Sequence, residues 1–176
     1  MSAPAQTDFD VLALYAALDA QRQARKLSWQ RVALEINRTS QRVPARSLSA
    51  STIASMNKKR SIEADGVLQM LLWLQRTPES FVPGPSAIAP EAASLPPIAA
   101  DQVLRFDPRA LYQALDTRRL ARGLTWAQVA LELGSSSASS LTRLAKAGGR
   151  VAFPQVMRLT RWLGTPAAQF TRVSNW

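Results

Sequence analysis

A segment of ten residues occurs twice in this chain, and this repeat constrains the fold more than any other feature. The first copy, 27–36, reads LSWQRVALEI, and the second, 124–133, reads LTWAQVALEL. In each copy a hydroxyl residue, Ser28 or Thr125, precedes apolar residues at helical spacing, which predicts a helix with a side-chain N-cap. Gln128 stands three residues after Thr125 and predicts a capping box. The chain of 176 residues therefore contains two related helical units.

The segments around the two copies correspond as well. Predicted first helices begin at Asp10 and Asp107, and predicted fourth helices occupy 63–75 and 154–163. A Thr-Pro pair follows each fourth helix and predicts a last short helix with proline at its first position. Each unit is thus predicted to contain five helices.

Proline and alanine dominate the segment between the units, and charged residues are scarce there. This composition predicts an extended tether at 83–102. The predicted fold class is all-α, with two tandem five-helix domains at 8–82 and 103–173 joined by the Pro/Ala-rich linker. At ~3.1 Å per residue, about twenty linker residues reach roughly 60 Å, which lets both units meet one elongated partner.

Positive charge lies on the units and not on the tether. The formal net charge of +10 divides into +4 for residues 1–82, −2 for 83–102 and +8 for 103–176. This distribution favours a polyanionic partner, although a generic basic surface or an anionic membrane would also suit it. No run approaches the ~20 apolar residues that span a bilayer, and no lysine-rich amphipathic helix supports membrane binding. We expect no membrane partner.

The chain has neither cysteine nor histidine. Disulfides and thiolate metal sites are therefore excluded, and the commonest metal ligand and general acid/base is missing. There is no pair of carboxylates at catalytic spacing and no glycine-rich phosphate loop. We expect a protein that is not an enzyme and has no cofactor and no metal.

The third predicted helix of each unit, 50–59 or 137–146, has only two apolar anchors. The other positions are small, hydroxylated or basic. A lightly anchored polar helix of this kind suits the major groove of DNA, although a solvated surface helix has the same composition. The anchors are Ile53 and Met56 in one copy and Leu141 and Leu144 in the other.

The whole pattern resembles the phage-repressor/Cro type of helix-turn-helix domain, the lambda repressor-like DNA-binding family. The residues that carry the resemblance are 124–134, 139–144, 161–166 and Phe170, and it extends over both units. It implies a sequence-specific double-stranded DNA-binding protein, a bacterial or phage transcriptional regulator that occupies an asymmetric two-part site. It also implies a cytoplasmic protein associated with the nucleoid.

The resemblance also assigns DNA-binding residues. The base-reading face falls on the exposed side of the third helices, and the lysines one turn later suit phosphates. Arg143 is the long bidentate donor among them, and guanine is its expected partner. The assigned residues are Ala50, Ser51, Thr52, Ser55, Lys58 and Lys59 in the first unit, and Ala138, Ser139, Ser140, Arg143 and Lys146 in the second.

Two further features are assigned with alternatives. Trp29 and Trp126 stand where the family often has a glutamine that touches the DNA backbone, so each indole either donates to a phosphate or packs against the start of the third helix. The first unit has an inserted loop at 37–48 with arginines at 38, 42 and 46. Arg38, Arg42 and Arg46 either contact phosphates or the minor groove, or belong to a tolerated surface insertion.

An alternative function is a protein-interaction module, antitoxin-like or an adaptor, that keeps the helix-turn-helix fold without reading DNA. The inserted loop and the weak base-reading chemistry of the first unit favour it. The first unit also has an apolar run, Leu71, Leu72 and Trp73, where the second has Thr160, Arg161 and Trp162. That run predicts a contact, either between the repeats or in a homodimer.

Overall fold

Two short strands accompany the helices in this computed structural model. The structure describes residues 8–39, 47–59, 62–85, 88–89, 91–99, 102–134, 137–146 and 151–175. Helices dominate these segments, so the chain is mainly α as predicted. The prediction of an all-α fold is wrong in one respect, because Gln102–Phe106 and Thr171–Asn175 form an antiparallel two-stranded sheet. Val103 and Phe106 in the first segment, and Thr171 and Val173 in the second, are of residue types that favour a strand.

The first half of the chain forms four α-helices and three short 3₁₀ helices among the described residues. Asp10 caps the first helix, as predicted, by accepting a hydrogen bond from the Ala13 N–H at 2.8 Å. The third helix is shorter than predicted, because it ends at Ala54 and continues as a 3₁₀ turn. In chain order the elements are α1 (Val11–Ala24), α2 (Trp29–Ile36), η1 (Asn37–Thr39), α3 (Ala50–Ala54), η3 (Met56–Lys58), α4 (Ala64–Leu74) and η4 (Pro78–Phe81).

The second half repeats this order and adds the strands. Thr125 and Gln128 form the predicted capping box at the start of the second helix. The third helix again gives way to a 3₁₀ turn, after Thr142. The elements are β1 (Gln102–Phe106), α5 (Pro108–Ala121), α6 (Trp126–Glu132), α7 (Ala138–Thr142), η5 (Arg143–Ala145), α8 (Phe153–Leu163), η6 (Ala167–Phe170) and β2 (Thr171–Asn175).

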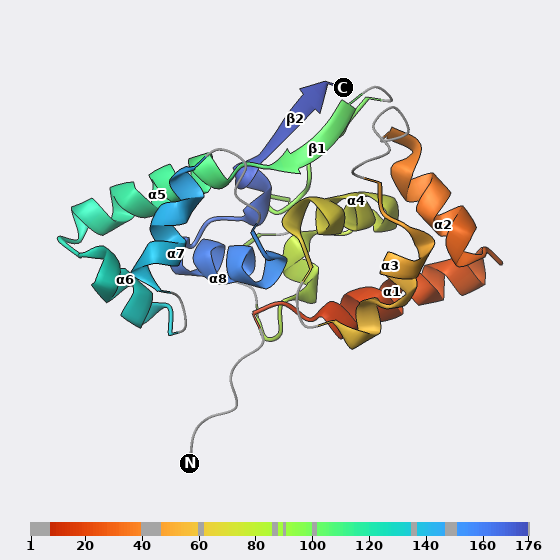
Figure 1. Ribbon diagram of the computed structural model, residues 1–176, viewed down its shortest axis with the longest axis horizontal. Helices are drawn as coiled ribbons and strands as arrows, with labels where there is room; N and C mark the ends of the chain where they lie inside the picture. The colour runs from red at the N-terminus through yellow and green to blue at the C-terminus, as the bar shows by residue number, and fades with distance from the viewer. Residues whose placement is uncertain are drawn as a thin grey trace, which may run out of the picture.

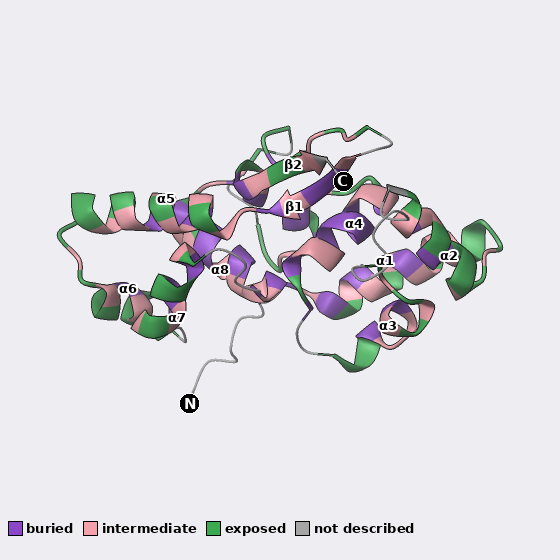
Figure 2. Cartoon of the chain, turned by 45° about the horizontal axis from the view of Figure 1, so that its top comes forward, coloured by how far each residue is buried: buried purple, intermediate pink, exposed green. Residues whose placement is uncertain are grey.

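The two halves share one hydrophobic core. The Phe9 ring lies against the Phe153 ring of the other half, with the ring centroids 4.7 Å apart. In turn, β1 of the second half packs on α4 of the first half, where the Gln69 side chain donates to the Leu104 carbonyl at 2.8 Å. Figure 2 shows the buried residues gathered on α4, α8 and β1, at the centre of the molecule.

Equivalent residues of the halves meet at the middle of this interface. Glu63 precedes α4, Ala152 precedes α8, and the two residues form an isolated antiparallel β-bridge. Seen in Figure 1, α1 to α4 lie to the right of this junction and α5 to α8 to the left. Equivalent residues can pair with each other in this way only when a local twofold axis relates the halves.

The segment predicted as an extended tether contacts the core. Ala93 is 1% exposed, and Leu95 and Ile98 pack against the hydrophobic cluster. Apolar residues among the prolines account for the difference, because burying them stabilises one path along the surface. The domain boundaries at 82/83 and 102/103 stay a prediction.

The apolar run on α4 is only partly a surface. Leu71 is fully buried and Leu72 is half-buried, and α4 contacts both β1 and α8. The structure therefore favours a contact between the repeats over a homodimer contact for this helix. The Trp73 indole N–H donates to Glu35 of its own half.

None of the helices in the described part of the chain is both long and apolar enough to cross a membrane.

Candidate nucleic-acid interface

The third helices α3 and α7 are each held by two buried side chains. Ile53 and Met56 are 0% exposed, and Leu141 and Leu144 are 0% and 3% exposed. These are the predicted anchors: α3 packs against α2 and α7 against α6, and the η3 and η5 turns that hold Met56 and Leu144 pack against α1 and α5. The other residues of both helices are exposed or half-buried.

Serine caps hold the first turn of both helices. The Ser49 hydroxyl accepts from the Thr52 N–H at 3.0 Å, and the Ser137 hydroxyl accepts from the Ser140 N–H at 3.2 Å. The Ser51 and Ser139 hydroxyls lie 2.9 and 3.0 Å from those same caps. The polar first turn of each helix is therefore ordered before any ligand binds.

The predicted base-reading and phosphate-binding residues lie on the solvent side of α3, η3, α7 and η5. Ser51, Lys58, Lys59, Ser139, Arg143 and Lys146 are exposed, and Ala50, Thr52, Ser55, Ala138 and Ser140 are half-buried. Within the described residues no ion pair engages Lys58, Arg143 or Lys146. There is no acidic residue in 47–59 or 137–146, so both surfaces attract anions.

Both helices lie on the same side of the molecule. In Figure 1, α3 and α7 lie toward the viewer, one on each side of the α4–α8 junction, and in Figure 2 both lie along the lower edge. The local twofold axis accounts for this, because it carries one helix onto the position of the other.

The tryptophans at the starts of α2 and α6 pack against the first helix of their unit. Trp29 stacks on Tyr15 with ring centroids 5.7 Å apart, and Trp126 stacks on Tyr112 at 5.2 Å. Neither indole N–H is hydrogen-bonded within the described residues, so both remain available as donors. Each tryptophan therefore packs on the first helix of its half, and the predicted contacts with the third helix or with phosphate stay predictions.

The inserted loop of the first half is closed at its base. The Asn37 side chain donates to the Leu48 carbonyl at 2.7 Å and accepts from the Leu48 N–H at 2.9 Å. This pair of hydrogen bonds fixes the entry to α3 despite the insertion. Arg38 is exposed in η1, whereas Arg42 and Arg46 lie outside the described residues.

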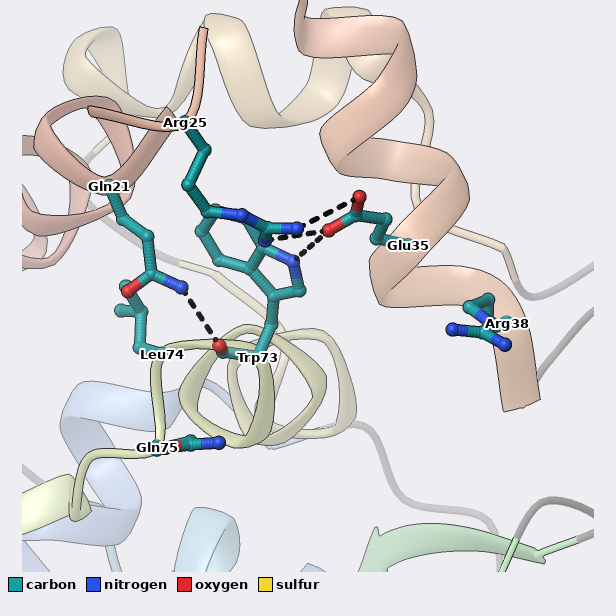
Figure 3. Close-up of a pocket in the computed structure, with 7 residues that line it drawn as sticks. All are labelled: Gln21, Arg25, Glu35, Arg38, Trp73, Leu74 and Gln75. Carbon is teal, nitrogen blue, oxygen red and sulfur yellow. Dashed lines mark hydrogen bonds and ion pairs between the residues drawn. The ribbon is translucent and has the colours of Figure 1, made fainter. Parts of the chain in front are cut away.

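A cluster of arginine, glutamate and tryptophan supports each unit, and sequence reasoning missed it. In the first half the Arg25 guanidinium binds Glu35 with two hydrogen bonds, at 2.7 and 3.2 Å, and the Trp73 indole donates to the same carboxylate at 3.0 Å. The cluster borders an open depression of about 400 Å³ between α1, α2 and α4 (Figure 3). The hydrogen bonds of this cluster connect the end of α1 to α2 and α4.

The second half repeats this cluster with Arg122, Glu132 and Trp162. The guanidinium reaches the carboxylate at 2.7 and 2.9 Å, and the indole does so at 2.8 Å. In the first half, the hydrogen bond from Trp73 and the hydrogen bond and charge of Arg25 lower the pKa of Glu35. In the second half, the hydrogen bond from Arg122 and, to a smaller extent, that from Trp162 lower the pKa of Glu132. The signal in the sequence was the recurrence of all three residue types at corresponding positions.

Comparison of the chain with family models, with curated proteins and with solved structures found no match.

Proposed function

We propose that the protein binds double-stranded DNA through two helix-turn-helix units of five helices each, one in each half of the chain. The observation that carries the proposal is the placement of α3 and α7 on one side of the molecule, with hydroxyl and cationic side chains exposed and no acidic residue among them. We propose occupancy of the site as its mechanism, as in a bacterial or phage transcriptional regulator.

Each exposed residue type has a role that its chemistry supports. Arg143 offers the forked guanidinium that pairs with O6 and N7 of guanine, worth ~1–3 kcal/mol of discrimination. Lys58, Lys59 and Lys146 are suited to phosphate oxygens, where they contribute affinity that salt weakens. Trp29 and Trp126 can add indole donors to the backbone, because both nitrogens are free of partners within the described residues.

The test compares specific with non-specific binding, since a protein with a net charge of +10 attracts any polyanion. Duplexes selected from a random library and their scrambled versions are titrated by fluorescence polarisation with wild type and Arg143→Ala. The variant should lose about tenfold or more on the selected duplex and much less on the scrambled one. Equal losses would reduce Arg143 to a phosphate contact, and no preference for any selected duplex would contradict sequence-specific binding.

A pair of exposed leucines favours a second candidate, a protein-interaction module. Leu34 on α2 and Leu131 on α6 occupy the same position in the two repeated segments and are 50% and 81% exposed. Isolated exposed leucines are common, but here the same position is apolar and exposed in both halves. Light scattering behind size-exclusion chromatography, with and without duplex, separates the candidates. The protein-interaction module would be supported if the chain self-associates, does not bind duplex, and loses its self-association in Leu34→Gln and Leu131→Gln.

A further inference from the structure

The hydrogen bonds at the centre of the molecule define how the halves are related. The Ala64 N–H donates to the Val151 carbonyl at 3.0 Å, and the Phe153 N–H donates to the Ile62 carbonyl at 2.9 Å. Ala64 and Phe153 are each the first residue of the fourth helix, and Ile62 and Val151 each precede it by two positions. Exchanging the halves therefore converts one hydrogen bond into the other. Such a self-complementary contact requires a twofold axis, whereas copies related by translation would join unlike surfaces.

The chain ahead of each first helix repeats this relationship. Phe9 crosses to pack on Phe153 of α8, and the Asp8 carboxylate accepts from the Arg158 guanidinium at 2.6 Å. In the other direction the Phe106 N–H donates to the Asp65 carboxylate of α4 at 2.9 Å. Each half is therefore anchored on the fourth helix of the other, and the orientation of the two units is fixed by a buried interface.

We infer that the DNA target, given the DNA-binding function proposed above, is a single duplex that carries two half-sites in inverted orientation at one fixed spacing. The twofold axis turns α3 and α7 in opposite directions on the same face, and the half-sites read by such helices mirror that symmetry. A flexible tether would also accept direct repeats and variable spacing. The shared core removes that freedom.

The inverted repeat is imperfect at a predictable position. The residue before the second buried anchor is Ser55 in the first unit and Arg143 in the second, because Met56 and Leu144 are equivalent anchors. Ser51 and Ser139, and Thr52 and Ser140, offer matching hydroxyl groups. One half-site should therefore carry a strongly preferred guanine at the position that Arg143 reaches, and the other should tolerate several bases there.

The test begins with selection of bound duplexes from a random library by the full chain. The aligned sequences should show two inverted half-sites. A duplex with one half-site reversed, to make a direct repeat, should bind at least tenfold more weakly. Insertion of about five base pairs, half a helical turn, between the half-sites should weaken binding as strongly. Equal or tighter binding to the direct repeat, or tolerance of the insertion, would overturn the inverted arrangement while leaving DNA binding intact.

The asymmetry is tested by a matched pair of variants. Ser55→Arg should shift the preference toward a perfect inverted repeat with guanine at the equivalent position of both half-sites. Arg143→Ser should remove the guanine preference from the one half-site that has it. Circular dichroism verifies that both variants stay folded. If Ser55→Arg gains its guanine preference in a half-site that lies in direct, not inverted, orientation to the other, the inference is overturned. If selection enriches no sequence with wild type or with either variant, the proposed function is overturned as well.

Discussion

Glu63 and Ala152 form an antiparallel β-bridge, and each is the residue that immediately precedes the fourth helix of its half. The bridge is central to a continuous core that includes Phe9, Phe153 and β1. Two small helical units of this size could each have folded separately. Their shared core instead makes the orientation of α3 relative to α7 a property of the fold.

The shared core predicts that the two halves unfold together. Phe153 is 0% exposed and touches Phe9 of the other half, so Phe153→Ala should destabilise the whole chain by about 3–5 kcal/mol. Urea unfolding should be followed by tryptophan fluorescence and by circular dichroism. For each protein the two probes should report the same single transition, and that of the variant should lie at lower urea concentration. Two separate transitions, with only the second half affected, would show that the halves are independent.

The repeat also identifies two strained positions in the first half. Lys26 and Gln75 have positive φ angles of 52° and 55°, and the corresponding residues of the second half are Gly123 and Gly164, at 63° and 65°. A side chain in this conformation costs ~1 kcal/mol that glycine avoids. Lys26→Gly and Gln75→Gly should therefore each raise the free energy of unfolding by about 0.5–1 kcal/mol.

The reverse exchange supplies the control for that prediction. Gly123→Lys and Gly164→Gln should each lower the free energy of unfolding by a similar amount, as measured by urea denaturation. If Gln75→Gly destabilises the chain instead, the left-handed conformation at the end of α4 does not limit its stability.

Glu79 makes stability depend on pH at the interface between the halves. One carboxylate oxygen accepts from the Ala167 N–H of η6 at 2.8 Å, and the other is buried without a partner among the described residues. Burial raises the pKa of Glu79 above its ordinary value. The folded chain therefore binds this proton more tightly than the unfolded chain. The stabilisation is complete below pH ~4.5 and is lost as the pH rises through the folded pKa.

Glu79→Gln keeps the acceptor for Ala167 and removes the buried charge. At pH 7 the variant should be more stable than wild type by about 1 kcal/mol, and the difference should shrink as the pH falls toward 4. Urea unfolding at both pH values checks this, with exposed Glu91→Gln as the charge-matched control. A variant that is less stable than wild type at pH 7 would mean that the ionised carboxylate stabilises the interface.

The sequence was sufficient to predict features that depend on neighbouring residues and that occur in both repeats. The caps at Asp10 and Thr125, the anchors Ile53 and Leu141, and the order of the helices follow from spacing within a few residues. The repeat supplied a check on each of them. The lengths of α3 and α7 were overestimated, because no single residue marks the change from α to 3₁₀ geometry.

The missing parts depend on contacts between distant residues. Phe9 carries no local signal that it will pack on Phe153, and the strand at 102–106 was assigned in part to a tether. The two hydrogen bonds between Asn37 and Leu48 close a loop across eleven positions. The arginine–glutamate–tryptophan clusters likewise join three helices. Spacing along the chain does not identify such partners.

The dependence of duplex affinity on salt, measured for wild type, Lys58→Ala and Lys146→Ala, tests the central claim most directly, because it asks whether both third helices meet the same DNA. Each variant should reduce the slope of log K against log salt concentration by about one, and exposed Arg109→Ala on α5 should leave it unchanged. A slope that equals the wild-type value in either lysine variant, or no binding of duplex at about 50 mM salt, would contradict DNA binding through both α3 and α7.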